Sequence, residues 1–152
     1  MRAVAAGAAA GAAGTTALDA VTYLDMALRG RPSSDTPEQT IEAMSKLTKI
    51  RVPGAGETRS NRVAGIGPLA GMVTGVGSGV VLALIPRTGW RPGYRAAVGI
   101  ATGLALLGSN GPMTALGVTD PRTWPASSWI SDVIPHLTYG AITAAVLRNL
   151  DH

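Results

Sequence analysis

The stretch VAGIGPLAGMVTGVGSGVVLALIP, residues 63–86, contains no charged side chain and is rich in Gly and Val. It is longer than the roughly 20 residues that an α-helix needs to cross the hydrocarbon core of a bilayer. A second charge-free run of similar length covers residues 96–119, and residues 129–148 carry charges only near their two ends. Each of these runs predicts a membrane-spanning helix.

Residues 3–28 form a fourth apolar run, which only Asp19 and Asp25 interrupt. Charged residues make up 14% of the chain, against about 25% in an average soluble domain. A soluble Ala/Gly-rich helical protein of 152 residues would be too small to bury two charge-free runs completely. A secretory signal at the N-terminus is the alternative for the first run, but Gly and Ala make a poor apolar core for a signal.

We therefore predict an all-α integral membrane protein with a single membrane domain, residues 1–152. Its four transmembrane helices form a compact, Gly-rich bundle and cover residues 3–28, 63–86, 96–119 and 129–148.

The connection 29–62 is long and polar and contains the signals of one further helix. Thr36 followed by Pro37 and Gln39 is typical of a helix start, because the hydroxyl can cap and Pro fits the first turn. Apolar side chains then recur on one side, at Ile41, Met44 and Leu47. This pattern predicts an amphipathic surface helix over 37–50. The alternative is a helix packed on the ends of the bundle.

Glycines recur at every fourth position of the second predicted span, at Gly67, Gly71, Gly75 and Gly79. Glycines four apart lie on one face of a helix and let another backbone approach closely. The first and third spans repeat the spacing once each. The pattern predicts tight helix packing, with the partner helix in the same chain, in a second copy or in a larger membrane complex.

Charge distribution and composition indicate in which cellular membrane the protein lies. Lys and Arg are more numerous on the side of the first and third connections, which favours a cytoplasmic position for residues 29–62. Arg far outnumbers Lys, and Ala and Gly are abundant, as in proteins from GC-rich bacteria. We expect a multi-pass protein of the bacterial inner membrane, in contact with the lipid bilayer. No basic run has interleaved aromatics, so nucleic acid is not an expected partner.

Asp19 is the residue that most needs an explanation, because it lies well inside the first span. At 1.5 Å per residue it is about 13 Å below the predicted boundary at Leu28. Asn110 in the third span and His136 in the fourth lie at about the same depth from the same membrane side. A polar stripe on the fourth span adds Asp132 and Tyr139, and Tyr23 follows Asp19 by one turn.

We predict that three helices place Asp19, Asn110 and His136 in one polar layer, so that Asp19 has partners at its own depth, with Asp132 nearer the surface. The predicted site for a small ligand or proton consists of Asp19, Tyr23, Asn110, Asp132, His136 and Tyr139. Asp19 and His136 would form a proton- or cation-handling pair, since His titrates near neutrality. The alternative is a hydrogen-bonded clamp that only fixes the bundle.

No catalytic signature is present, and we expect no catalytic residue, metal or cofactor. The chain lacks HExxH and GxSxG, and the Gly-rich second span lacks the Lys of a phosphate loop. Asp19, Asp132 and His136 do not have the spacing of a specific metal site. A membrane-embedded metal enzyme is therefore the weakest hypothesis.

The stretch YLDMALRGRPSSDTPEQT, residues 23–40, with the Ala/Gly-rich helix before it, resembles small multi-pass membrane proteins of GC-rich bacteria. The resemblance covers the first third of the chain and implies a membrane location, but no activity and no site residues.

Two functional hypotheses follow. In the first, a polar intramembrane site binds or moves a small solute or a proton. In the second, the chain is an accessory or scaffold subunit that docks a larger membrane partner through its glycine faces.

Overall fold

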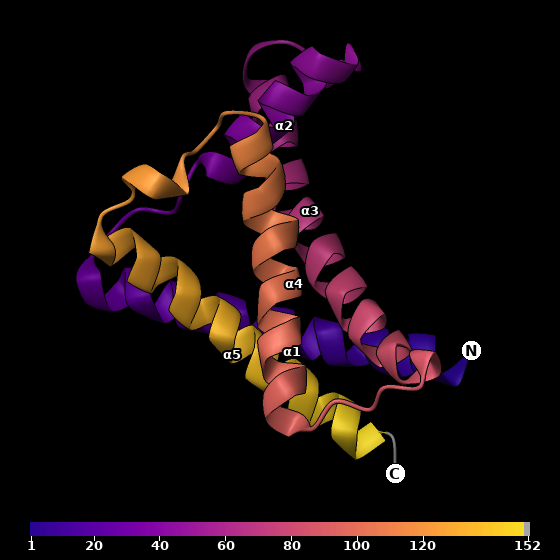
Figure 1. The fold of residues 1–152 in the computed structure, drawn as a ribbon. Coiled ribbons are helices and arrows are strands. Elements are labelled where there is room, and N and C mark those ends of the chain that lie inside the picture. Colours follow the sequence, from indigo (N-terminus) through magenta and orange to yellow (C-terminus); the bar gives the residue numbers. More distant parts are fainter. Residues whose placement is uncertain (151–152) are drawn as a thin grey trace.

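A computed structural model describes residues 1–150, and every regular element in this range is helical. Figure 1 shows the helices α1 (Arg2–Arg29), α2 (Thr36–Thr48), α3 (Gly56–Leu84), α4 (Tyr94–Ala115) and α5 (Ala126–Leu150), with the short 3₁₀ turns η1 (Ile85–Thr88) and η2 (Pro121–Thr123).

Three of the helices are long and apolar enough to cross a membrane: α1, α3 extended by η1, and α5. Helix α4 has 22 residues but is not in this group. Its second half contains Ser109, Asn110 and Pro112, which lower its apolar content. An all-helical chain with three candidate spans agrees with the sequence-based prediction, and the fourth span stays a prediction.

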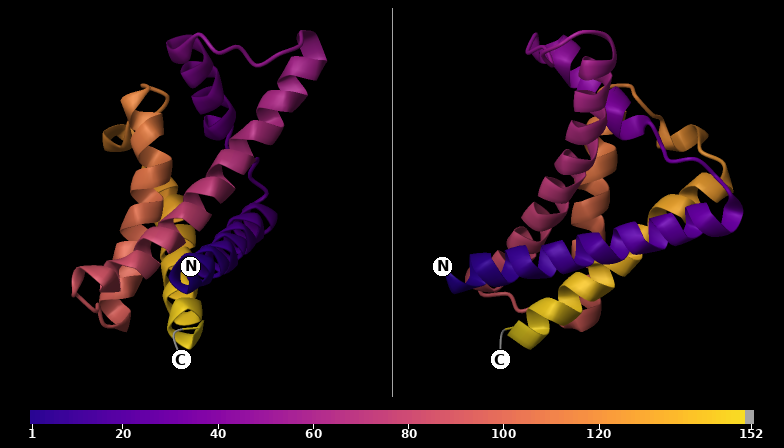
Figure 2. Two further views of the ribbon diagram at one scale, coloured as in Figure 1. Left: turned by 90° about the vertical axis from the view of Figure 1, so that its right-hand side faces the viewer. Right: turned by 180° about the vertical axis from the view of Figure 1, so that it is seen from behind.

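The helices meet at one end of the molecule and diverge toward the other (Figures 1 and 2). Helices α1 and α5 run in opposite directions and pack against each other, α1 also packs against α3, and α4 packs against α5 and α3. The N-terminus, η1 and the end of α5 lie at the closed end. At the other end, α3 and α4 lead away from α1 and α5, so the helices are splayed where the prediction had them in a compact bundle.

The α1–α3 crossing is held by direct backbone contact at glycines. A methyl group added to Gly11 would lie 2.6 Å from the carbonyl oxygen of Gly75, and one on Gly79 would lie 2.6 Å from the Cα of Gly11. A methyl group on Gly7 would lie 2.7 Å from the Gly79 carbonyl oxygen. Any larger residue at these positions would push the two backbones apart.

Gly71, one turn before Gly75 on α3, has open space where a side chain would be. Helices α1 and α3 cross at an angle, so they have already separated at this position (Figure 2). The predicted line of four packing glycines is therefore divided. Gly75 and Gly79 contact α1, Gly67 contacts Pro37 of α2, and Gly71 contacts nothing within 4 Å.

Helix α2 packs along the first half of α3 and turns the pair into a hairpin. The Arg59 guanidinium donates to both carboxylate oxygens of Glu42, at 2.6 Å for Oε2. This guanidinium holds the pKa of Glu42 below its ordinary value. The polar residues before Val63 are therefore helical, because they pair with α2 rather than with lipid, and α3 begins earlier than its charge-free run. Helix α2 thus packs on α3, while Met44 and Leu47 of its predicted apolar face stay exposed. Its position at a membrane surface stays a prediction.

Candidate functional site

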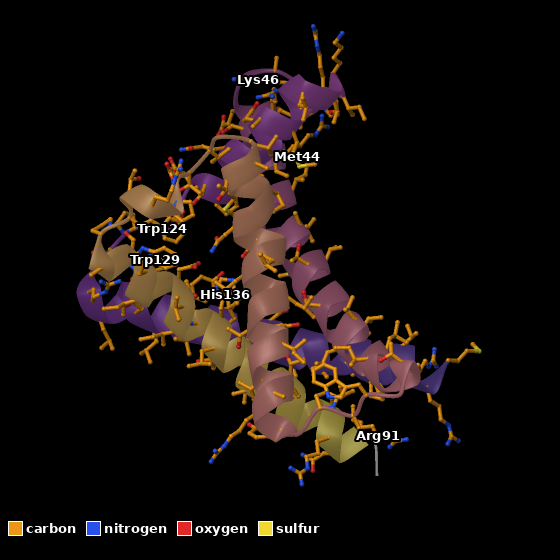
Figure 3. All side chains as sticks on the ribbon, viewed as in Figure 1. Met44, Lys46, Arg91, Trp124, Trp129 and His136 are labelled. Atoms are coloured by element: carbon orange, nitrogen blue, oxygen red, sulfur yellow. The ribbon has the colours of Figure 1, made fainter. Side chains whose placement is uncertain are left out.

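A polar cluster joins α4 to α5 in the region where the two helices cross. It consists of Ser109 and Asn110 from α4 and of Asp132 and His136 from α5. The His136 and Asp132 side chains are only 11% and 19% exposed. Figure 3 shows His136 on the side of α5 that faces α4, away from the Trp124–Trp129 pair at the start of α5.

Both ring nitrogens of His136 have partners. Nδ1 lies 2.7 Å from the backbone carbonyl oxygen of Asp132, and Nε2 lies 3.1 Å from Ser109 Oγ. A carbonyl oxygen only accepts, so the hydrogen of this bond is on Nδ1. A neutral His136 therefore presents an unprotonated Nε2 to Ser109.

The Ser109 hydroxyl has a choice of acceptors. Its Oγ lies 2.9 Å from the carbonyl oxygen of Ala105, as well as 3.1 Å from His136 Nε2. A hydroxyl has one hydrogen and can also accept. With neutral His136, this hydrogen points at Nε2. With protonated His136, Nε2–H donates to Ser109 Oγ and the hydroxyl hydrogen turns to Ala105. Both charge states of the imidazole are fully hydrogen-bonded without movement of a helix.

The carboxylate beside the imidazole is also held in place. Asp132 Oδ2 accepts from the Asn110 side-chain amide at 2.8 Å, and Asp132 Oδ1 lies 3.5 Å from His136 Nδ1. A protonated His136 would thus have a counter-charge one turn away on its own helix. Because Pro135 lacks an N–H, it frees the carbonyl of Ser131, but the imidazole bonds the carbonyl of Asp132 instead.

The cluster continues to the predicted membrane surface through charged groups. Arg29, the last residue of α1, donates to Ser131 of α5 and pairs with Asp25, which also accepts from Arg31 at 2.6 Å. These contacts tie the end of α1 to the turn of α5 that carries Asp132. Asp25 and Arg29 are four residues apart and thus lie on one face of α1.

Asp19 does not join the cluster. Within residues 1–150, no hydrogen bond or ion pair involves its side chain, and the predicted contact with His136 is not formed. Gly11 and Gly14 of α1 face α3 and α5 and thereby fix the rotation of the helix. Thr15 lies close to Gly75 of α3, whereas Asp19, one turn further on, has no bonded partner within the described residues.

The two predicted tyrosines also lie outside the cluster. Tyr23 is 63% exposed, on the face of α1 that Asp19 shares. Tyr139 is fully buried and donates to the Gly75 carbonyl oxygen at 2.6 Å. A methyl group on Gly14 would lie 2.8 Å from the Tyr139 ring. Tyr139 of α5 therefore packs on α1 through its ring and bonds α3 through its hydroxyl.

Sequence reasoning missed Ser109. It precedes Asn110, which the depth argument did identify, but a serine in a helix usually bonds its own backbone four residues back. The Ser109 hydroxyl lies within hydrogen-bonding distance of the Ala105 carbonyl oxygen, and it also lies within hydrogen-bonding distance of His136. Only the approach of α5 reveals the second role.

Metal ligation finds no support in the described part of the chain, where no group of three His, Asp or Glu residues could hold an ion. A hollow of about 1180 Å³ lies elsewhere, between α2, the start of α3 and the end of α4. Two of its carboxylates, Asp35 and Glu42, already bond Gln39 and Arg59.

No family model matches the chain, and comparison with curated proteins and with solved structures also gives no match.

Proposed function

We propose that the chain is a small integral membrane protein that takes up and passes a proton at the α4–α5 polar cluster. Helix α4 would be a fourth crossing, beside α1, α3 and α5, and residues 29–62 would face the bacterial cytoplasm. The observation that carries the proposal is the bonding of His136, whose two nitrogens keep partners in both charge states.

The surroundings of His136 favour a proton over a larger solute. A proton needs only an exchangeable nitrogen, a nearby carboxylate and a hydroxyl that can reverse its bond. His136, Asp132 and Ser109 supply these groups within hydrogen-bonding range. Ionisable groups at membrane depth are expensive and mark proton paths in many transporters.

The test is a flux measurement on the purified protein in liposomes that contain a pH-sensitive dye. After an acid jump outside, the wild type should acidify the lumen. His136→Gln should abolish this flux, because an amide does not titrate, and Ser109→Ala should slow it about 10-fold or more. Tyr23→Phe, on the exposed side of α1, is the matched control and should conduct normally. A folded His136→Gln protein with wild-type flux would refute the proposal.

A second candidate function is favoured by one other observation, the opening between α1 and α3. Asp19 of α1 has no bonded partner within residues 1–150, and a side chain added at Gly71 of α3 would meet open space. A transmembrane helix of a partner subunit, with a hydrogen-bond donor for Asp19, would fit this position. In that case Gly71→Leu should release a subunit that co-purifies, while Gly99→Leu on α4 should retain it.

A further inference from the structure

The α2–α3 hairpin ends in a surface that no other part of the described chain covers. Its apolar side chains Leu47 and Ile50 are 72% and 75% exposed, and Met44 is 44% exposed. Its cations form no ion pair within residues 1–150. We call this surface the hairpin tip and define it as Met44, Lys46, Leu47, Lys49, Ile50 and Arg51.

The charge of the hairpin tip has one sign. No acidic residue occurs from position 43 to position 56, whereas Lys46, Lys49 and Arg51 lie within six consecutive residues. The nearest carboxylate of α2, Glu42, is already bonded to Arg59. Figure 3 shows Met44 and Lys46 at the far end of the hairpin, at the opposite extreme of the molecule from Arg91. An anionic surface is therefore the complementary partner.

The position of the tip relative to the bilayer identifies that surface. The charge-free part of α3 begins at Val63, and Gly56 lies about 10 Å further out along the helix. The headgroup layer is about 5 to 7 Å thick on each side of the hydrocarbon core. Helices α1 and α3 diverge (Figure 1), so they cannot both stand upright in one bilayer, and a tilt of α3 would lower the tip toward the headgroups.

We propose that the hairpin tip binds the headgroups of anionic phospholipids, with Leu47 and Ile50 inserted between them and Lys46, Lys49 and Arg51 against the phosphates. Exposed apolar side chains flanked by cations are the combination that holds amphipathic helices at membrane surfaces. The interaction is independent of the proton site, because α4 and α5 contribute no residue to the tip.

A single-cysteine label tests the proposal cleanly, because the natural chain contains no Cys. The full-length Leu47→Cys protein, labelled with an environment-sensitive fluorophore, is placed in nanodiscs of phosphatidylcholine, with or without phosphatidylglycerol. We expect blue-shifted emission and quenching by headgroup-proximal spin-labelled lipid only when phosphatidylglycerol is present. Each of Lys46→Gln, Lys49→Gln and Arg51→Gln should lower the bound-to-free ratio of the tip about fivefold.

Arg91→Gln is the matched control, since it removes a cation at the opposite end and should leave the signal of the label unchanged. High salt should lower the lipid-dependent signal of the labelled protein with all three cations present, as the neutralising variants do. Because this protein carries no neutralising substitution, the result does not depend on whether a variant folds. Identical, water-exposed emission in both lipid mixtures would overturn the proposal. So would burial of the label only when an acidic soluble protein is added, which would assign the tip to a protein partner.

Discussion

Tyr139 and His136 lie on successive turns of α5, yet their polar groups are bonded in different ways. The Tyr139 hydroxyl is fully buried at the junction of α1, α3 and α5, where its bond to Gly75 is fixed. His136 lies between α5 and α4, where its partner Ser109 has a second acceptor. The first arrangement ties three helices together and stabilises the fold. The second offers the Ser109 hydroxyl two acceptors, which is what the proposed proton exchange requires.

The largest change in stability is expected where the glycines of α1 and α3 bring the two backbones into contact. Gly79→Ala places a methyl group against the backbone of α1, which cannot move as a side chain can. We expect a loss of about 3 kcal/mol in the free energy of unfolding, measured by SDS titration in mixed micelles. Gly71→Ala, eight residues earlier on α3 and in open space, is the control and should be neutral or stabilising by up to about 1 kcal/mol. Equal losses of stability for both variants would contradict the difference between Gly79, which contacts α1, and Gly71, which does not.

A smaller effect separates the two α5 residues directly. Tyr139→Phe removes the bond to the Gly75 carbonyl and should lower the unfolding free energy by about 1 kcal/mol, with proton flux per folded molecule unchanged. His136→Gln should do the reverse, with near-normal stability and no flux. If Tyr139→Phe also abolished the flux in a folded protein, the division of α5 into a structural and an exchanging turn would be wrong.

The smallest effect concerns the α2–α3 hairpin. Arg59 lowers the pKa of Glu42, so the pair stabilises the folded state above the ordinary pKa of a glutamate, about 4.3. This contribution is lost as the pH falls further, through the lowered pKa of the folded state. Protection of the α2 amides from hydrogen exchange, corrected for the intrinsic pH dependence of the rate, should therefore fall only below about pH 4. Glu42→Gln should show the reduced protection already at neutral pH, and unchanged protection in this variant would argue against the pair.

The sequence predicted the helices better than their arrangement. Runs with few or no charges located the apolar parts of α3 and α5, because a helix that crosses lipid excludes most charge. They could not locate the start of α3, since residues 56–62 become helical through contact with α2. Glycine spacing indicated the close approach at Gly75 and Gly79, but not the open position of Gly71, which depends on the crossing angle.

The polar cluster was likewise only partly predictable, because its contacts depend on how the helices are arranged. Equal depth correctly brought Asn110 and His136 into one cluster, because depth follows from counting residues from a boundary, and the polar stripe on α5 added Asp132. It wrongly added a contact with Asp19, because contact also requires the correct rotation of α1, and the glycine face of α1 sets that rotation. Ser109 could be recognised only after α4 and α5 were placed side by side.

The most direct test of the account is the protonation state of His136 in the folded protein. Nitrogen NMR of ¹⁵N-histidine-labelled protein in bilayers can resolve its ring nitrogens, and His136→Gln separates its signals from those of the other histidine, His152. We predict a neutral ring protonated on Nδ1 at high pH and a ring protonated on both nitrogens at low pH, with the helices unchanged. A ring protonated on Nε2 alone, or one that does not titrate while the protein is folded, would contradict the account.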